Sequence, residues 1–236
     1  MSKTSQPKTN RPSAKDFAGF PATGLRFLAD LERNNDRTWF AQRKTLYQKE
    51  LKAPAERFAT LVAEGLEALL DRPVREKIFR IHRDLRFLKD KRPYNSHLRM
   101  AFFEETGDQP PAFGFYLSIE PRTTVLGGGS FAFPKGLLVA YRDAVSADDE
   151  GDEIAALVDG LVARGYRLNE PELKRVPSGF AQTHPRVALL RRKSLALWRD
   201  LPDHKAVSGP DAVATCLGIF AELLPLRRLI AELSDR

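Results

Sequence analysis

Four short segments of the chain alternate between apolar and polar residues, and this alternation constrains the fold more than any other feature. They are FRIHRDLRF at 79–87, HLRMAFF at 97–103, AFGFYLSIE at 112–120 and TVLGGGSFAF at 124–133. A period of two is typical of β-strands, because successive side chains point to opposite faces of a sheet. The connections are short, so the sequence predicts four consecutive strands in an antiparallel meander.

Spacing typical of helices surrounds this region. Between residues 17 and 70 apolar residues recur at intervals of three and four, with expected N-caps at Thr23 and Asp36 and a helix entered through Pro54. The acidic run at 146–153 is expected to open a helix, because carboxylates favour the positive end of the helix dipole. The last third of the chain predicts an edge strand and irregular connection over 166–180, a helix from Pro185, a strand over 194–198, and a helix over 209–233 that breaks near Pro225.

These elements predict the fold class α+β: a mainly antiparallel sheet of about five to six strands, packed against an N-terminal helical layer and C-terminal helices. Residues 1–16 are basic and polar without an apolar run, so we expect a disordered basic arm rather than a secretory signal. Residues 17–236 are expected to form a single α+β domain, since no internal linker is long enough to separate two.

The composition narrows the location and the partners. The only cysteine is Cys216, and no apolar stretch reaches the roughly eighteen residues of a membrane span, so we expect a cytoplasmic protein without a membrane partner. A net charge of +7 favours anionic partners, nucleic acid among them. The four histidines lack metal-binding spacing and there is no cysteine cluster, so no metal is predicted. No dinucleotide or phosphate-loop fingerprint is present, so no cofactor is predicted either.

Charge is concentrated in the first alternating segment. Arg80, Arg83 and Arg86 surround Asp84, and one carboxylate cannot neutralise three guanidinium groups. Arginine binds phosphate or carboxylate oxygens in a bidentate manner. We therefore predict a site for a small anionic ligand, phosphorylated or carboxylated, on this strand. Its expected residues are Arg80, Arg83, Arg86 and Lys91 for binding, Tyr94 for orientation, Asp84 to hold the arginines or serve as a base, and Gly127, Gly128 and Gly129 to admit the ligand close to the backbone.

Two other interpretations of this segment stay open. The arginines could form a structural lattice with Glu104, Glu105 or Glu120 on neighbouring strands. The chain could also be a non-catalytic module that binds nucleic acid or protein, with a second basic cluster at 174–199 that includes Trp198. No residue pattern specifies a reaction, so the sequence does not decide whether the protein is an enzyme.

Several of these strings together resemble a known family. RIHRDLRFLKDKRPY, FYLSIEP, GGGSFAFP and RVPSGF…HP…LLRRKSL are similar to an uncharacterised bacterial and fungal family, domain of unknown function 2461. Its hallmark corresponds here to Arg80, Arg83, Asp84, Arg86, Phe87, Asp90, Lys91 and Tyr94. His82 departs from that pattern, which favours an aromatic residue such as tyrosine, and this counts against a catalytic role for His82. The resemblance extends from about Phe17 to the C-terminus and implies a fold and a region of interest, not a reaction.

Overall fold

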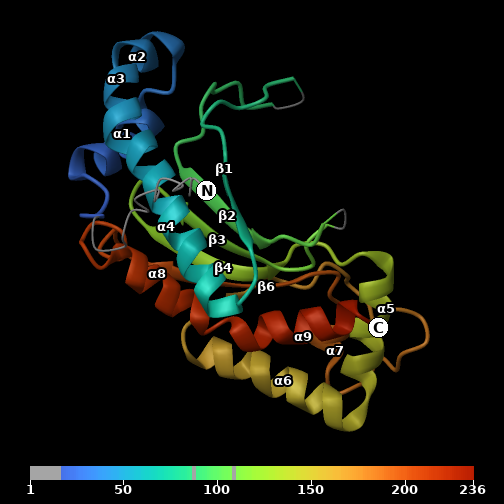
Figure 1. Cartoon of the computed structure of the whole chain (residues 1–236). Coiled ribbons are helices and arrows are strands. Elements are labelled where there is room, and N and C mark those ends of the chain that lie inside the picture. Colours follow the sequence, from blue (N-terminus) through green and yellow to red (C-terminus); the bar gives the residue numbers. More distant parts are fainter. Residues whose placement is uncertain (1–16, 87–88, 108–109) are drawn as a thin grey trace, which may run out of the picture.

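The protein is an α+β structure built on one six-stranded antiparallel sheet (Figure 1). The computed structural model describes residues 17–86, 89–107 and 110–236, so the basic arm predicted for 1–16 and the strand position predicted for Phe87 lie outside the described residues. The strands follow the order β1-β2-β3-β4-β6-β5. Their bounds are β1 Val74–Ile78, β2 Leu98–Glu104, β3 Gly114–Ile119, β4 Thr124–Ser130, β5 Arg167–Leu168 and β6 Leu195–Leu201.

Strands β1 to β4 form an antiparallel meander in which β2, β3 and β4 are the predicted strands, and β6 adds to its far side. Tyr116 of β3 pairs with Gly127 of β4, which in turn pairs with Trp198 of β6. The expected edge strand is β5, which pairs with β6 at Arg167 and Leu168. The order of the sheet therefore pairs residues of β4 and β6 that lie about 65 to 77 positions apart in the sequence.

The helices pack on one face of this sheet (Figure 1). Helix α4 contacts β1, while α8 and α9 contact β4. Phe102 and Phe115, on neighbouring strands, both pack against Phe220 of α8. The helical bounds are α1 Ala22–Arg33, α2 Arg37–Gln42, α3 Lys44–Leu46, the π-helix η2 Tyr47–Lys52, α4 Ala53–Leu70, α5 Lys135–Ser146, α6 Asp148–Ala163, α7 Val187–Leu190, α8 Ala212–Ala221 and α9 Leu224–Ser234.

Alternation explains why the sheet has one buried face. Phe115, Leu117 and Ile119 of β3 are buried against the helices, as their period of two predicts, whereas Tyr116 and Ser118 point to the other side and are partly exposed. Burying each large apolar side chain contributes roughly 1.5–3 kcal/mol. The core therefore lies between the sheet and the helical layer, and the opposite face of the sheet is not covered by helices.

The structure confirms one predicted helix cap and corrects the other. Asp36 is the N-cap of α2, and its carboxylate accepts a hydrogen bond from the Trp39 backbone N–H at 2.9 Å. Thr23 is not a cap, because α1 already begins at Ala22 and the Thr23 hydroxyl instead donates to Glu50 at 2.8 Å. The break expected near Pro225 separates α8 from α9, whereas the helix α5 was not predicted.

The strand predicted for Phe79–Arg86 is wrong. Strand β1 ends at Ile78, and after Phe79 donates its N–H to the Arg99 carbonyl at 2.9 Å, the chain leaves the sheet. It folds back on itself as an irregular hairpin, in which His82 and Tyr94 form an isolated bridge. We call the residues Phe79–Arg86 and Lys89–His97 the arginine hairpin.

In the described chain no helix is both long and apolar enough to cross a bilayer.

Candidate anion-binding cleft

The arginine hairpin is fixed to the N-terminal helical layer through Tyr94. The side-chain amide of Asn35 donates to the Tyr94 carbonyl and accepts from the Tyr94 N–H, both at 3.0 Å, as the backbone of a neighbouring strand would. The Tyr94 ring stacks on Phe40 and meets His82 edge to face. With 7% of its surface exposed, Tyr94 packs as a core residue at the base of the hairpin. This anchoring sets where the other hairpin residues lie.

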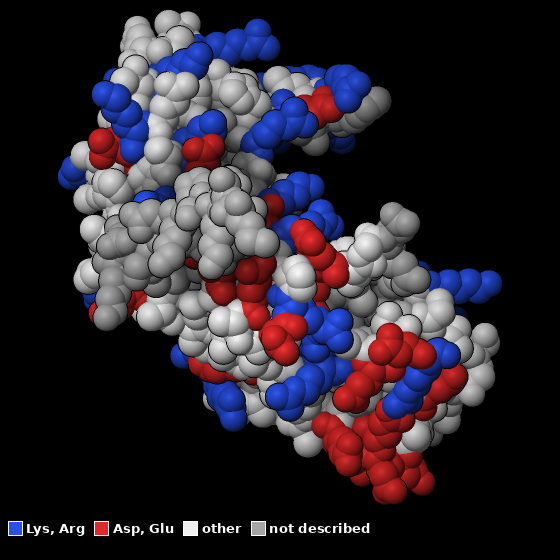
Figure 2. All heavy atoms as spheres, in the orientation of Figure 1, with Lys and Arg blue, Asp and Glu red and all other residues white. Residues whose placement is uncertain are grey.

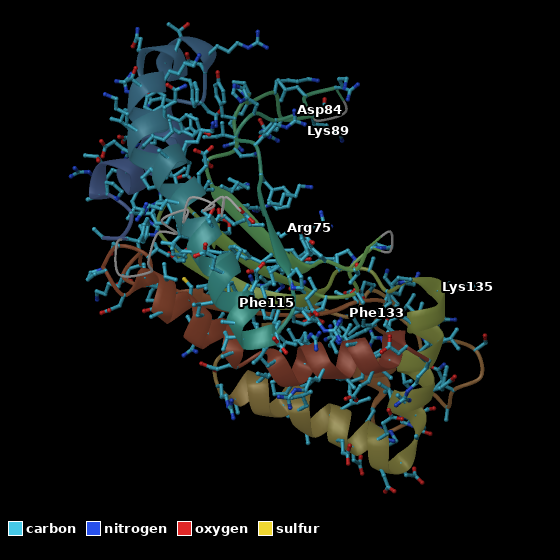
Figure 3. The ribbon with its side chains drawn as sticks, viewed as in Figure 1. Arg75, Asp84, Lys89, Phe115, Phe133 and Lys135 are labelled. Carbon is cyan, nitrogen blue, oxygen red and sulfur yellow. The ribbon has the colours of Figure 1, made fainter. Side chains whose placement is uncertain are left out.

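Asp84 and Arg86 lie near the end of the hairpin, away from the sheet. Figure 3 shows Asp84 and Lys89 at this end. Arg86 donates to Asp84 through Nε and through Nη2, the latter at 2.6 Å, and these bonds hold the pKa of Asp84 below its usual value, with a smaller contribution from the charge of Arg80. Both side chains are exposed, so this pair stands in water rather than in a pocket.

Asp90 joins the two sides of the hairpin. Its carboxylate accepts from Arg92 and from Arg83, each at 2.9 Å, and these hydrogen bonds hold the pKa of Asp90 far below its usual range. Arg83 also donates to the Arg92 carbonyl at 3.1 Å, and its side chain is only 18% exposed. Lys91 donates to the Leu85 carbonyl at 3.1 Å. The structure thus places Arg83 and Lys91 in contacts that close the hairpin.

The glutamates considered as lattice partners contact other cations. Glu104 pairs with Arg227 of α9 and lies 3.8 Å from Arg72, while Glu120 lies near His97 and Arg99. For Glu105 the structure gives a backbone bond to Pro73. The carboxylates that the structure places beside Arg83 and Arg86 are therefore those of the hairpin itself, Asp90 and Asp84.

A cleft of about 560 Å³ lies between the arginine hairpin and the open face of the sheet. Figure 2 shows the hollow on the right of the molecule, below the hairpin and edged by lysine and arginine side chains, whereas acidic side chains gather at the far end, over the start of α6. The residues that line the cleft all belong to strands and loops: Phe79, Arg80, Asn95, His97, Arg99, Met100, Tyr116, Leu117, Ser118, Glu120, Val125, Phe131, Arg167, Asn169 and Trp198. This volume is in the range typical of small-molecule sites.

Two arginines supply positive charge to the cleft from one side. Arg80 is exposed, and it forms no ion pair with any residue in the described part of the chain; Asn95 donates to its backbone carbonyl at 3.2 Å. Arg99 of β2 lies 3.8 Å from Glu120, too far for a direct hydrogen bond. Of the ligand-binding side chains predicted from sequence, Arg80 is the one that the structure places on the cleft wall.

Polar groups extend from this wall into the cleft. The Ser118 hydroxyl donates to Glu120 at 2.6 Å, and the Nδ1 atom of His97 lies 3.7 Å from the same carboxylate. Burial lowers the pKa of His97, the charges of Arg99 and Arg83 lower it further, and Glu120 opposes them. His97 is therefore held toward its neutral form, in which one ring nitrogen donates a hydrogen bond and the other accepts one.

Aromatic side chains form the floor of the cleft. Tyr116 lies 4.5 Å from Phe131 and 5.8 Å from Trp198, measured between ring centroids, while Phe131 and Trp198 stack at 5.4 Å. Burial raises the pKa of Tyr116 to about 12, so its hydroxyl stays protonated. Arg167 lies over the Trp198 ring at 6.0 Å and pairs with Asp200. We call Tyr116, Phe131 and Trp198 the aromatic floor.

The glycine run of β4 shapes this floor. A Cβ atom on Gly127 would lie 2.6 Å from the Trp198 indole and against the Leu197 carbonyl, so only glycine lets the indole lie flat there. Gly128 instead faces Phe113 and Leu223 on the helical side, and Gly129, with φ at +146°, lies against the backbone of β6. Gly127 therefore lies under the Trp198 indole, which lines the cleft, whereas Gly128 and Gly129 face other parts of the packed structure.

Sequence reasoning missed most of the residues that line the cleft. Tyr116 and Ser118 alternate with core residues of β3, and Trp198 follows the buried Leu197, so each occupies the face of a strand that the core does not use. A large aromatic residue on the non-core face of a strand, opposite a glycine, is a sequence signal from which Tyr116 and Trp198 could have been predicted.

No group of three or more metal-ligating His, Cys, Asp or Glu side chains occurs among the described residues.

The fold and the cleft define an α+β protein whose antiparallel sheet is covered by helices on one face and open on the other. The chain belongs to the family of conserved hypothetical proteins DUF2461, whose model matches residues 23–228. This match confirms the resemblance noted from the sequence, and it spans both the arginine hairpin and Trp198. A comparison with curated proteins found no match.

Proposed function

We propose that this protein binds a small anionic ligand, phosphorylated or carboxylated, in the cleft between the arginine hairpin and the open face of the sheet. The observation that carries the proposal is the position of Arg80, a guanidinium without an ion pair among the described residues, on the wall of a cleft of about 560 Å³. Arg99 lies on the same wall with only a long contact to Glu120. Two such arginines favour an anion through charge-assisted hydrogen bonds.

The other residues of the predicted site have supporting roles in this proposal. Arg83, Lys91 and Tyr94 hold the hairpin in place, so that Arg80 faces the cleft. Arg86 and Asp84 neutralise each other near the end of the hairpin, which leaves Asp84 no base role in the cleft. Gly127 lets the Trp198 indole pack against β4, Gly128 makes room for Phe113 and Leu223 on the helical side, and Gly129 keeps the β4–β6 packing close.

Calorimetric titration with inorganic phosphate, sugar phosphates and dicarboxylates tests the proposal. Arg80→Gln should weaken the best of these ligands about tenfold or more, the effect expected when a hydrogen bond to a charged group is lost. Arg228→Gln is the matched control, because it removes the same charge from an exposed position on α9, away from the cleft. Equal affinities of the two variants, or no binding by the wild-type protein, would contradict the proposal.

The alternative is a module that binds nucleic acid through its basic surface. Binding to a polyanion weakens steeply with salt, because each neutralised phosphate releases counterions. A small ligand with one anionic group should show a much shallower dependence. Titrations at two salt concentrations with a short oligonucleotide and with a sugar phosphate therefore separate the two functions.

The proposal includes a cytoplasmic location. The sole cysteine, Cys216, is fully buried in α8, so the chain depends on no intrachain disulfide that an oxidising compartment would have to form. Fractionation of cells that express the tagged chain tests this part.

A further inference from the structure

The aromatic floor presents more apolar ring surface than an anion alone would need. Phe131 is 52% exposed and Phe79, on the hairpin side of the cleft, is 41% exposed, although large aromatic side chains are usually buried. Both line the same cleft as Trp198. Exposed apolar groups that converge on one concave site indicate a ligand that covers them.

The geometry of the floor favours a flat partner. Trp198 and Phe131 stack with 21° between their planes, and Gly127, which has no side chain, lies between Tyr116 and Trp198 in the strand pairing. The absence of a Cβ at this position leaves the partly exposed indole in contact with the sheet, where it stacks with the more exposed Phe131 ring. Aromatic faces bind planar rings by offset stacking and the hydrophobic effect.

Polar groups reach this floor from two sides. Arg80 and Arg99 lie on the hairpin side, while Arg167 and Asn169 come from the β5 edge, where the Arg167 guanidinium lies over the Trp198 ring. The hydroxyl of Ser118 already donates to Glu120, so the floor offers few partners for a ring that carries hydroxyl groups on all sides. The faces of an aromatic ring need no hydrogen bonds, whereas a sugar ring carries hydroxyl groups that need partners.

We infer that the anionic ligand also carries a planar aromatic ring, and that a nucleotide is its chemical class. This inference rests on the proposed function: the phosphate group contacts Arg80 and Arg99, and the base stacks on Trp198 and Phe131. Nucleotides combine both chemistries at the scale of a cleft of about 560 Å³. Stacking on aromatic side chains tolerates different bases, because every base has a π-face.

Trp198 allows a direct spectroscopic test. The chain has two tryptophans, and the other, Trp39, lies on α2, so Trp39→Phe leaves Trp198 as the only indole. The probes are the four nucleoside 5′-monophosphates, adenosine, ribose 5-phosphate and inorganic phosphate, with calorimetry alongside fluorescence. We expect the nucleotides to quench Trp198 and to bind at least about tenfold more tightly than ribose 5-phosphate, in line with the effect of losing one base stack.

Two further variants sharpen the test. Phe131→Leu keeps an apolar side chain at an exposed position, so the protein should fold, and nucleotide affinity should fall severalfold while ribose 5-phosphate affinity stays the same. Arg80→Gln should weaken nucleotides and ribose 5-phosphate by the same factor. Together the variants assign the ring and the phosphate to separate parts of the cleft.

The outcomes distinguish a failure of the aromatic inference from a failure of the proposed anion binding. If ribose 5-phosphate and inorganic phosphate bind as tightly as the nucleotides, the aromatic inference is wrong and anion binding stands. If adenosine binds as tightly as its monophosphate, the ring is recognised and the proposed anion function fails. If none of the probes binds, both fail, and an affinity that rises with oligonucleotide length and falls steeply with salt would replace both with nucleic-acid binding.

Discussion

The rings of Tyr94 and Phe40 stack with 4.1 Å between their centroids and 14° between their planes. One ring belongs to the arginine hairpin and the other to α2, so this pair joins the hairpin to the N-terminal helical layer. Beside it, Asn35 pairs with both backbone polar groups of Tyr94. The direction in which Arg80 enters the cleft therefore depends on contacts made by residues about 40–60 positions earlier in the chain.

The first prediction concerns Tyr94, which we assign to packing rather than to ligand contact. Tyr94→Ala should lower the free energy of unfolding by roughly 3–5 kcal/mol, the usual cost of truncating a buried aromatic residue. Tyr94→Phe keeps the ring and should leave both stability and anion affinity close to the wild-type values. Urea denaturation and calorimetry measure the two quantities, and a large loss of affinity in Tyr94→Phe would assign the hydroxyl to the ligand instead.

The second prediction compares the two aspartates of the hairpin. Asp90→Asn removes the carboxylate that joins Arg83 and Arg92, so the Arg83 and Asn95 amides, which bond across the hairpin to Pro93 and Ile81, should exchange hydrogen faster. Asp84→Asn changes an exposed pair near the end of the hairpin and should leave those exchange rates unchanged. Equal exchange in both variants would show that Asp90 does not close the hairpin.

The third prediction concerns Gly127. Gly127→Ala places a methyl group against the Leu197 carbonyl and the Trp198 indole, and the resulting overpacking should cost roughly 1–3 kcal/mol and shift the emission of Trp198. Gly160→Ala is a matched control at an exposed position of α6, where the added Cβ meets no atom within 4 Å. That change should stabilise the protein by up to about 1 kcal/mol, because alanine favours a helix more than glycine does.

The fourth prediction is a pH dependence that arises from His97. Its folded-state pKa is lowered mainly by burial, so between that value and the unfolded value near 6.5 the unfolded chain binds more protons. Stability should therefore fall as the pH decreases from about 6.5 toward the folded-state pKa. Urea denaturation between about pH 7.5 and 5 measures this, above the range where Asp84 and Asp90 take up protons.

His97→Gln should flatten that dependence, since glutamine does not ionise. A variant that loses stability toward acid as steeply as the wild-type protein would assign the pH dependence to other groups. Glu120 opposes the lowering of the His97 pKa, so removing its charge by Glu120→Gln should make the wild-type dependence steeper rather than flatter.

The spacing of apolar residues in the sequence correctly predicted those helices and strands that bury one face against the core. The period of two in β3 and the three- and four-residue spacing in α4 each match one buried face, and both elements form where expected. The same period misplaced the first strand. Two of the apolar residues in that segment have different environments, since Ile81 is buried whereas Phe79 is 41% exposed in the cleft. Alternation shows that side chains point in opposite directions, but it does not show that a neighbouring strand is present.

The candidate site was predicted less well because it is made by long-range pairing. Arg80 was identified from charge alone, and it lies on the cleft wall. The pairing of β4 with β6, which brings Trp198 beside Gly127 and Tyr116, follows from no feature of either segment read separately. Likewise, nothing near Asn35 in the sequence indicates that its side chain pairs with Tyr94.

The position of β6 also has a consequence for the order in which the protein folds. Strands β1 to β4 are consecutive, whereas β6 pairs with β4 only after the chain has passed through α5, α6, β5 and α7. Contacts between residues this far apart in the sequence form slowly, since the long segment between them must first close into a loop. During synthesis, β4 is an uncovered sheet edge until residues 195–201 have left the ribosome, and the glycines along it limit its tendency to pair with another chain. The aromatic floor is thus expected to be the last part of the sheet to form, and the fluorescence of Trp198 during refolding reports that step.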